Sequence, residues 1–176
     1  MEQPRINYYA GVKWGLQNPS VILVGEYHLP PLDRLALVHE FYRQGVLLPE
    51  MVDAARDLAV RFGIRKFFCD PSEPRFIERL KKEHLRAVAV QDEELAGINL
   101  ISERLQRSRE EGAGGLSLSR ECKNLIFEFQ RYHAPERDPN KPYRDKPVAV
   151  HHYALDALRF LVLGLSYETT PRVRWL

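Results

Sequence analysis

The chain lacks the features that mark secreted, membrane-spanning or disulfide-rich proteins. Cys69 and Cys122 are its only cysteines, and their wide spacing forms neither a disulfide framework nor a zinc-binding Cys-x-x-Cys pair. The apolar run at 160–165 is far too short to span a bilayer. Residues 1–5 contain no apolar segment of the kind found in signal peptides. We therefore expect a protein of a reducing compartment with no membrane partner.

A strong charge of one sign is absent too. Lys and Arg number 26 against 24 Asp and Glu, which gives a formal net charge of +2. Charge alone therefore identifies no nucleic-acid partner, although local basic clusters can still bind one. No Gly-x-x-x-x-Gly-Lys-[Ser/Thr] phosphate loop occurs in the sequence. A length of 176 residues with 44% hydrophobic residues suits one domain, and we expect a single domain over 1–176.

The spacing of apolar residues predicts an α/β protein with a mixed sheet. We expect strands at 6–12, 20–26, 35–42, 64–69, 87–90 and 116–118. We expect helices at 49–62, 72–83, 93–107, 120–132 and 148–166, with Ser72 as an N-cap. The proline- and charge-rich segment 133–147 is predicted to be a mobile loop, and 169–176 a tail. Three antiparallel strands followed by parallel ones, with helices on both faces, resemble the plan of the RNase H-like fold.

Asp70 is the residue that best indicates a site. It ends the apolar strand 64–69 and precedes a helix, so its carboxylate points into the crevice beyond the strand's carboxyl end. Open α/β sheets usually build their sites in that crevice. Two other segments could supply partners: 9–15, a strand that ends in a glycine turn after Lys13, and 151–159, the start of a late apolar helix.

Together these segments resemble the C-terminal nuclease domain of phage terminase large subunits. The resemblance rests on Gly-x-x-Trp-Gly at 11–15, Phe-Phe-Cys-Asp-Pro-Ser-Glu-Pro at 67–74 and His-x-Tyr-Ala-Leu-Asp-Ala-Leu-Arg-Phe at 151–160. It covers nearly the whole chain, and 70–74 and 154–159 are its most specific parts. It implies an RNase H-like endonuclease that cuts concatemeric viral DNA during genome packaging with Mg²⁺ or Mn²⁺. The implied partners are double-stranded DNA, a packaging ATPase domain, the small terminase subunit and the portal, in the cytoplasm of a bacterial host.

The implied chemistry needs several carboxylates at one point. Two cations about 3.5–4 Å apart activate water and stabilise the leaving oxygen, and hard Mg²⁺ prefers oxygen ligands. The resemblance assigns metal binding to Asp70 and Asp156. The alternatives are a turn aspartate at position 70 and an exposed Asp156 paired with Arg159 at i+3. His152 lies one helical turn before Asp156, so it could bind a metal or move a proton, or simply be a surface histidine.

Lys13 and His152 depart from the pattern of the family. The family has an aspartate that bridges both metals at the position of Lys13, and an Asp-His pair at 152–153. A lysine there repels the cations, by several kcal/mol for unit charges about 4 Å apart at intermediate dielectric. Three explanations stay open. The site is inactive, the Lys13 ammonium replaces one metal, or another residue such as Glu26 supplies the missing carboxylate.

Sequence-independent contacts to DNA phosphates are expected from basic residues around the crevice. The candidates are Arg75, Arg79, Lys82, Arg104, Arg107, Lys141 and Arg144. Since they are interleaved with glutamates, an ordinary solvated role is the alternative for each. Three functions therefore remain: a metal-dependent DNA endonuclease, a catalytically inactive DNA-binding or motor-docking module, and another RNase H-like enzyme such as a resolvase or hybrid nuclease.

Overall fold

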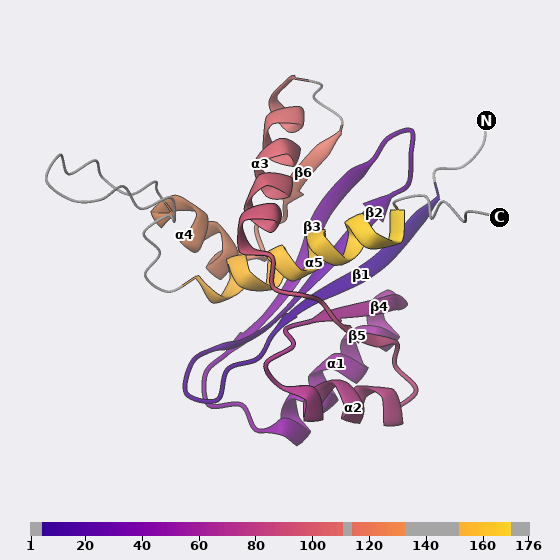
Figure 1. Cartoon of the computed structure of the whole chain (residues 1–176), viewed down its shortest axis with the longest axis vertical. Coiled ribbons are helices and arrows are strands. Elements are labelled where there is room, and N and C mark those ends of the chain that lie inside the picture. Colours follow the sequence, from indigo (N-terminus) through magenta and orange to yellow (C-terminus); the bar gives the residue numbers. More distant parts are fainter. Residues whose placement is uncertain (1–4, 111–113, 133–151, 170–176) are drawn as a thin grey trace, which may run out of the picture.

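A computed structural model describes residues 5–110, 114–132 and 152–169, and shows a six-stranded sheet with helices on both faces (Figure 1). The strands are β1 (Ile6–Lys13), β2 (Ser20–His28), β3 (Arg34–Arg43), β4 (Ile64–Cys69), β5 (Ala87–Ala89) and β6 (Gly115–Leu118). The helices are α1 (Leu48–Phe62), α2 (Pro74–Lys82), α3 (Glu94–Glu110), α4 (Lys123–Arg131) and α5 (Tyr153–Thr169). The predicted strands and helices are therefore confirmed, with shifted ends.

The strand order is β5-β4-β1-β2-β3-β6. Strands β1, β2 and β3 are antiparallel neighbours, whereas β4 pairs with β1, β5 with β4 and β6 with β3 in parallel. The predicted mixed sheet is confirmed. Because β1 and β4 are parallel neighbours at the centre, their carboxyl ends meet at one edge of the sheet.

Alternate side chains along the strands enter two separate cores. Ala10 and Val12 of β1 belong to the core under α1 and α2, with Phe67 of β4. Tyr9 of β1 and Phe68 of β4 belong to the core under α3, α4 and α5. Helix α5 is buried over most of its length and lies across β1 and β2 (Figure 1). Its burial on nearly all sides explains why its sequence is apolar all round.

Helix α5 packs directly on the backbone of β1 at Gly11. A Cβ atom on Gly11 would lie 2.0 Å from the carbonyl oxygen of Ala157 and 2.7 Å from the Cβ atom of Leu161. Only glycine therefore permits this approach. The same contact sets the height of Asp156, the residue before Ala157, above the end of β1.

Three helices begin two or more residues later than predicted. Ser72 is not an N-cap: α2 begins at Pro74, after the N-cap Glu73, whose side chain accepts a hydrogen bond from the Arg75 N–H. The Ser72 N–H instead donates to Asp70 at 2.9 Å, which closes an Asx turn before the helix. Helix α4 begins at Lys123 and α5 at Tyr153, later than expected.

The predicted loop at 133–147 and nearly all of the predicted tail lie outside the described residues. Cys69 and Cys122 are both free and buried, and the reducing compartment stays a prediction. Among the helices of the described part of the chain, none combines the length and apolar character needed to cross a membrane.

The contact at Gly11 yields a stability prediction. Gly11→Ala forces the methyl group against the Ala157 carbonyl oxygen, so we expect the free energy of unfolding to fall by roughly 3 kcal/mol or more. Gly63→Ala is the matched control, because its Cβ atom meets nothing within 4 Å and only its φ of 66° is strained. That control should lose about 1–2 kcal/mol. Urea denaturation measures both, and equal losses would contradict the close contact.

Candidate catalytic site

The register of the central strands brings Lys13 and Asp70 together. Lys13 ends β1, Asp70 follows β4 directly, and the Asp70 N–H donates to the carbonyl oxygen of Val12 at 2.9 Å. Trp14, the next residue after Lys13, stacks on Phe76 of α2 with ring centroids 5.5 Å apart. The end of β1 is therefore fixed both to β4 and to the helix that follows Asp70.

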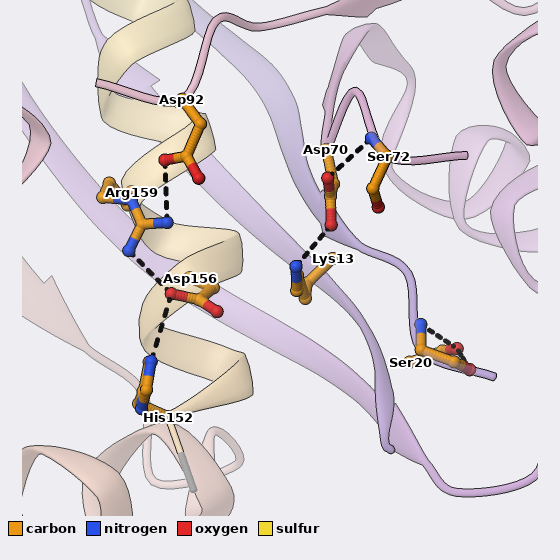
Figure 2. A network of polar contacts seen from close by, with 9 residues as sticks. Lys13, Ser20, Asp70, Ser72, Asp92, His152, Asp156 and Arg159 are labelled. Atoms are coloured by element: carbon orange, nitrogen blue, oxygen red, sulfur yellow. Dashed lines mark hydrogen bonds and ion pairs between the residues drawn. The ribbon is translucent and has the colours of Figure 1, made fainter. Parts of the chain in front are cut away.

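An ion pair occupies the predicted centre of the site (Figure 2). The Lys13 Nζ donates to Asp70 Oδ2 at 2.5 Å, and the Ser72 N–H donates to Asp70 Oδ1 at 2.9 Å. The Asp70 residue is 5% exposed and the Lys13 side chain 24% exposed. Both carboxylate oxygens are thus hydrogen-bonded, and the charge of Asp70 is balanced by a charge from the protein itself.

Asp156 forms a second ion pair on α5. The Arg159 guanidinium donates to Asp156 through Nη1 at 2.7 Å and to Asp92 through Nη2 at 2.9 Å. Burial raises the pKa of Asp156, while the positive charges of Arg159, His152 and Lys13 act in the opposite direction. Lys13 therefore lies within electrostatic reach of both aspartates. The sequence suggested Arg159 as the i+3 partner of Asp156. The two side chains do form an ion pair, but both are buried rather than exposed.

His152 faces the same aspartate, as its position one turn earlier predicts. Its Nε2 atom lies 3.8 Å from Asp156 Oδ1, which is too far for a hydrogen bond. Within the described residues its buried Nδ1 atom has no hydrogen-bond partner, although the side chain as a whole is 37% exposed. The structure thus brings together Lys13, Asp70, His152 and Asp156, while the role of each stays a prediction.

A cavity of about 270 Å³ opens beside Asp156, between α3, α4 and α5. Its apolar lining consists of Ile98, Ile101, Leu105, Phe129 and Leu155. Its polar lining consists of Glu94, Ser102, Tyr132, His152, Asp156 and Arg159. Burial is the main cause of the raised pKa of Asp156.

Glu128 supports the site and was missed by sequence reasoning. Its buried carboxylate accepts a hydrogen bond from the Leu155 N–H at 2.9 Å and another from the Tyr42 hydroxyl at 3.2 Å. It therefore satisfies an unpaired N–H in the first turn of α5, the turn that carries Asp156. Only its place on the buried side of the helix at 120–132 could have indicated this, because the partner segment is distant in the sequence.

Glu26 does not supply a missing carboxylate. It pairs with Tyr8, five positions before Lys13 on β1, so it lies about 17 Å away along the strand. Its two oxygens are bound by the Tyr8 hydroxyl and by His28, each at 2.7 Å. The sequence-based suggestion of Glu26 is therefore wrong, because the antiparallel register places it at the opposite edge of the sheet.

The residues predicted to contact DNA lie in separate parts of the chain. Arg75, Arg79 and Lys82 lie on the exposed face of α2, close after Asp70, and Arg79 pairs with Glu83. Their contact with DNA stays a prediction. Lys141 and Arg144 lie outside the described residues.

Arg104 and Arg107 have a structural partner instead. Both bind Asp33, at 3.2 and 2.6 Å, and so attach the β2–β3 loop to α3. That loop follows the end of β2, whose last residue pairs with the first residue of β1. The pair of arginines therefore lies toward the sheet edge opposite Asp70, away from the crevice.

The residues at the site do not fit a two-metal centre as they are placed. Among the residues that the structure describes, no three His, Cys, Asp or Glu side chains are grouped closely enough to hold a metal ion. Asp70 is bound by an ammonium and Asp156 by a guanidinium. Metal binding by Asp70 and Asp156 accordingly stays a prediction from the resemblance, and we derive no reaction step through a metal.

The fold defines the class of this protein. A mixed six-stranded sheet, antiparallel then parallel, with helices on both faces and an aspartate after the central parallel strand, is an RNase H-like α/β fold. The fold class predicted from the sequence is confirmed.

Solved structures of phage large terminases share this fold. A large terminase from a thermophilic bacteriophage, in complex with ADP, is 20% identical, superposes with a TM-score of 0.77 and covers 95% of this chain. The nuclease domain of the P22 large terminase has 15% identity and a TM-score of 0.69, and covers 95% of this chain and 86% of its own. The SPP1 large terminase nuclease domain, with bound manganese, has 20% identity and a TM-score of 0.63, covering 88% and 84%.

The similarity to complete large terminases covers only part of their length. The chain spans 41% of the length of the ADP-bound terminase, but more than four-fifths of the isolated nuclease domains from P22 and SPP1. No protein-family model and no curated protein sequence matches the chain. At such low identities the comparisons show the fold of a terminase nuclease domain.

The buried Glu128 leads to a prediction about pH. Burial is the main cause of its raised pKa. The folded protein therefore holds this proton more tightly than the unfolded chain does, so the contribution to stability is lost as pH rises through the raised pKa. Glu128→Gln keeps the size and one acceptor, and removes this dependence. We expect the stability of the unmodified protein relative to Glu128→Gln to fall as pH rises from the ordinary pKa of a glutamate toward the raised pKa of Glu128.

Urea denaturation of both proteins at several pH values measures this difference. The comparison cancels most of the titration of Asp156, which is present in both proteins, and keeps its electrostatic coupling to Glu128 within the difference. A difference in unfolding free energy that stays constant with pH would contradict the assignment.

Proposed function

We propose that this chain is the nuclease domain of a phage terminase large subunit, that it acts on double-stranded DNA, and that the Lys13–Asp70 ion pair attenuates its metal-dependent cleavage. The terminase nuclease fold supports the first part, together with the motifs at 67–74 and 151–160. The observation that carries the attenuation is the 2.5 Å contact between the Lys13 ammonium and Asp70.

The physical reason is electrostatic. Two-metal cleavage needs carboxylates that hold two cations about 3.5–4 Å apart. An ammonium that already binds Asp70 repels each unit of incoming charge by about 4 kcal/mol at 4 Å and an effective dielectric of 20. Binding a divalent cation at Asp70 therefore requires displacement of Lys13. We expect weak cleavage that depends on Mg²⁺ or Mn²⁺.

The proposed partners are those expected for a complete phage terminase. A packaging ATPase domain, the small terminase subunit and the portal are the proposed partners, in the cytoplasm of an infected or lysogenic bacterial host. The ADP in the related terminase structure is consistent with an ATPase in that longer protein.

A second candidate is a module that binds DNA or docks onto the motor without cutting. The observation in its favour is that two family carboxylate positions carry Lys13 and His152. It predicts salt-sensitive DNA binding without cleavage under any metal condition.

Plasmid nicking with Mn²⁺ tests the proposal. Lys13→Asp restores a carboxylate at the end of β1 and removes the competing ammonium, so we expect cleavage to rise at least tenfold, equivalent to about 1.4 kcal/mol. Lys13→Met is the matched control, because it removes the charge without adding a metal ligand, and it should gain less. Adding Asp70→Ala to Lys13→Asp should abolish cleavage.

The outcomes distinguish an attenuated nuclease from a module that does not cut DNA. If the unmodified chain already cleaves as fast as Lys13→Asp, the attenuation is wrong and the nuclease assignment stands. If every folded variant fails to cleave, the non-cutting module replaces the nuclease.

A further inference from the structure

The site carries its own countercharges where RNase H-like nucleases are expected to use metal ions. The ammonium of Lys13 balances Asp70, and the guanidinium of Arg159 balances Asp156. A DNA phosphate that approaches this edge therefore meets two neutral pairs rather than two bare carboxylates. Asp92, which shares Arg159, is 52% exposed, so water screens most of its charge.

We propose that Lys13 is a built-in phosphate-binding cation: its ammonium, held in place by Asp70, binds a DNA phosphate directly, so that the domain engages DNA at this site without a divalent metal. The inference rests on the proposed function, since it takes double-stranded DNA as the ligand. It deepens that function by naming the residue and the group that meet.

The geometry leaves the ammonium able to bind an anion. A lysine ammonium has three N–H donors, and one of them points to Asp70 Oδ2. The structure gives Lys13 no second hydrogen-bond partner in the part of the chain that it describes. Its side chain is 24% exposed at the end of β1, so solvent reaches part of it. A charge-assisted hydrogen bond to a phosphate oxygen is stronger than a neutral one.

Asp70 acts as a positioning residue for this ammonium. Its backbone N–H is bound to Val12 and its Oδ1 atom to the Ser72 N–H, so the carboxylate is fixed on two sides. A lysine held by a fixed carboxylate loses less conformational freedom when it binds a phosphate than a free surface lysine does. The ion pair therefore preorganises the cation instead of only neutralising it.

The helix that follows Asp70 carries further cations. Arg75, Arg79 and Lys82 on α2 come after the Asp70 turn and are exposed. They are the proposed contacts for neighbouring phosphates of the same duplex.

DNA-binding anisotropy with a labelled linear duplex in EDTA tests the inference. The unmodified protein should bind equally well in EDTA and in Mg²⁺ at matched ionic strength. Lys13→Gln should weaken binding about tenfold, the effect of losing one hydrogen bond between charged groups. The slope of log affinity against log salt should shrink by about one, because one phosphate contact is lost.

Lys66→Gln is the matched control. Lys66 also lies on a strand, is 22% exposed and forms an ion pair with Glu168, but it is four residues before Asp70 on β4. Its loss removes the same charge and should leave the salt slope unchanged. Circular dichroism confirms that each variant is folded.

A double variant separates phosphate binding from repulsion by an unpaired Asp70. Lys13→Gln with Asp70→Asn removes both charges of the pair, so no unpaired carboxylate remains. If Lys13 binds the phosphate, the double variant stays as weak as Lys13→Gln. Recovery of full affinity would overturn the inference, because the loss would then come from the unpaired charge of Asp70.

The remaining outcomes are equally decisive. Lys13→Gln with the affinity and salt slope of the unmodified protein overturns the inference and leaves the proposed function intact, as does a requirement of the unmodified protein for Mg²⁺. Absence of any binding to duplex DNA by the unmodified, folded protein overturns the proposed function itself.

Discussion

The direct contact between helix α5 and the backbone of β1 at Gly11 is the constraint on which the site depends. Ala157 meets Gly11 with no room for a Cβ atom, and the neighbouring Asp156 is thereby held above the end of β1. The parallel pairing of β1 with β4 then brings Asp70 beside Lys13. Gly164 permits a similar approach of α5 to Phe68. Close packing of one helix on the central strands thus assembles residues from three distant segments.

The chain itself supplies countercharges for the two buried aspartates of the site. Buried carboxylates are costly unless a cation lies close by. Asp70 and Asp156 each have one, Lys13 and Arg159, supplied by the chain itself. Glu128 has no such cation among the residues that the structure describes. It accepts hydrogen bonds from the N–H of Leu155 and the hydroxyl of Tyr42, and burial raises its pKa. The fold of a nuclease is thereby combined with a site whose charges are already paired.

Much of this arrangement could be predicted from the sequence because it depends on local patterns. Apolar alternation located β1, β2 and β4, and the position of Asp70 after an apolar strand indicated the crevice. Helix starts were less predictable, since the Asx turn from Asp70 to Ser72 delayed α2 until Pro74. Contacts between residues far apart in the sequence could not be predicted, because they depend on strand register and packing. They include the bonds of Glu128 to α5, of Asp33 to Arg104 and of Glu26 to Tyr8. Lys13 was recognised as discordant, but its pairing with Asp70 needed the three-dimensional structure.

The central claim is that Lys13, rather than a metal ion, is the cation bound to Asp70. Crystals grown with Mn²⁺ and measured at an X-ray energy where manganese scatters anomalously test it most directly. Our account predicts electron density for the Lys13 ammonium within hydrogen-bonding distance of Asp70 Oδ2, and no anomalous peak at that carboxylate. A fully occupied anomalous peak bound by Asp70 and Asp156, with the Lys13 side chain turned away, would contradict the account, because attenuated cleavage requires the metal-bound arrangement to be a minor one.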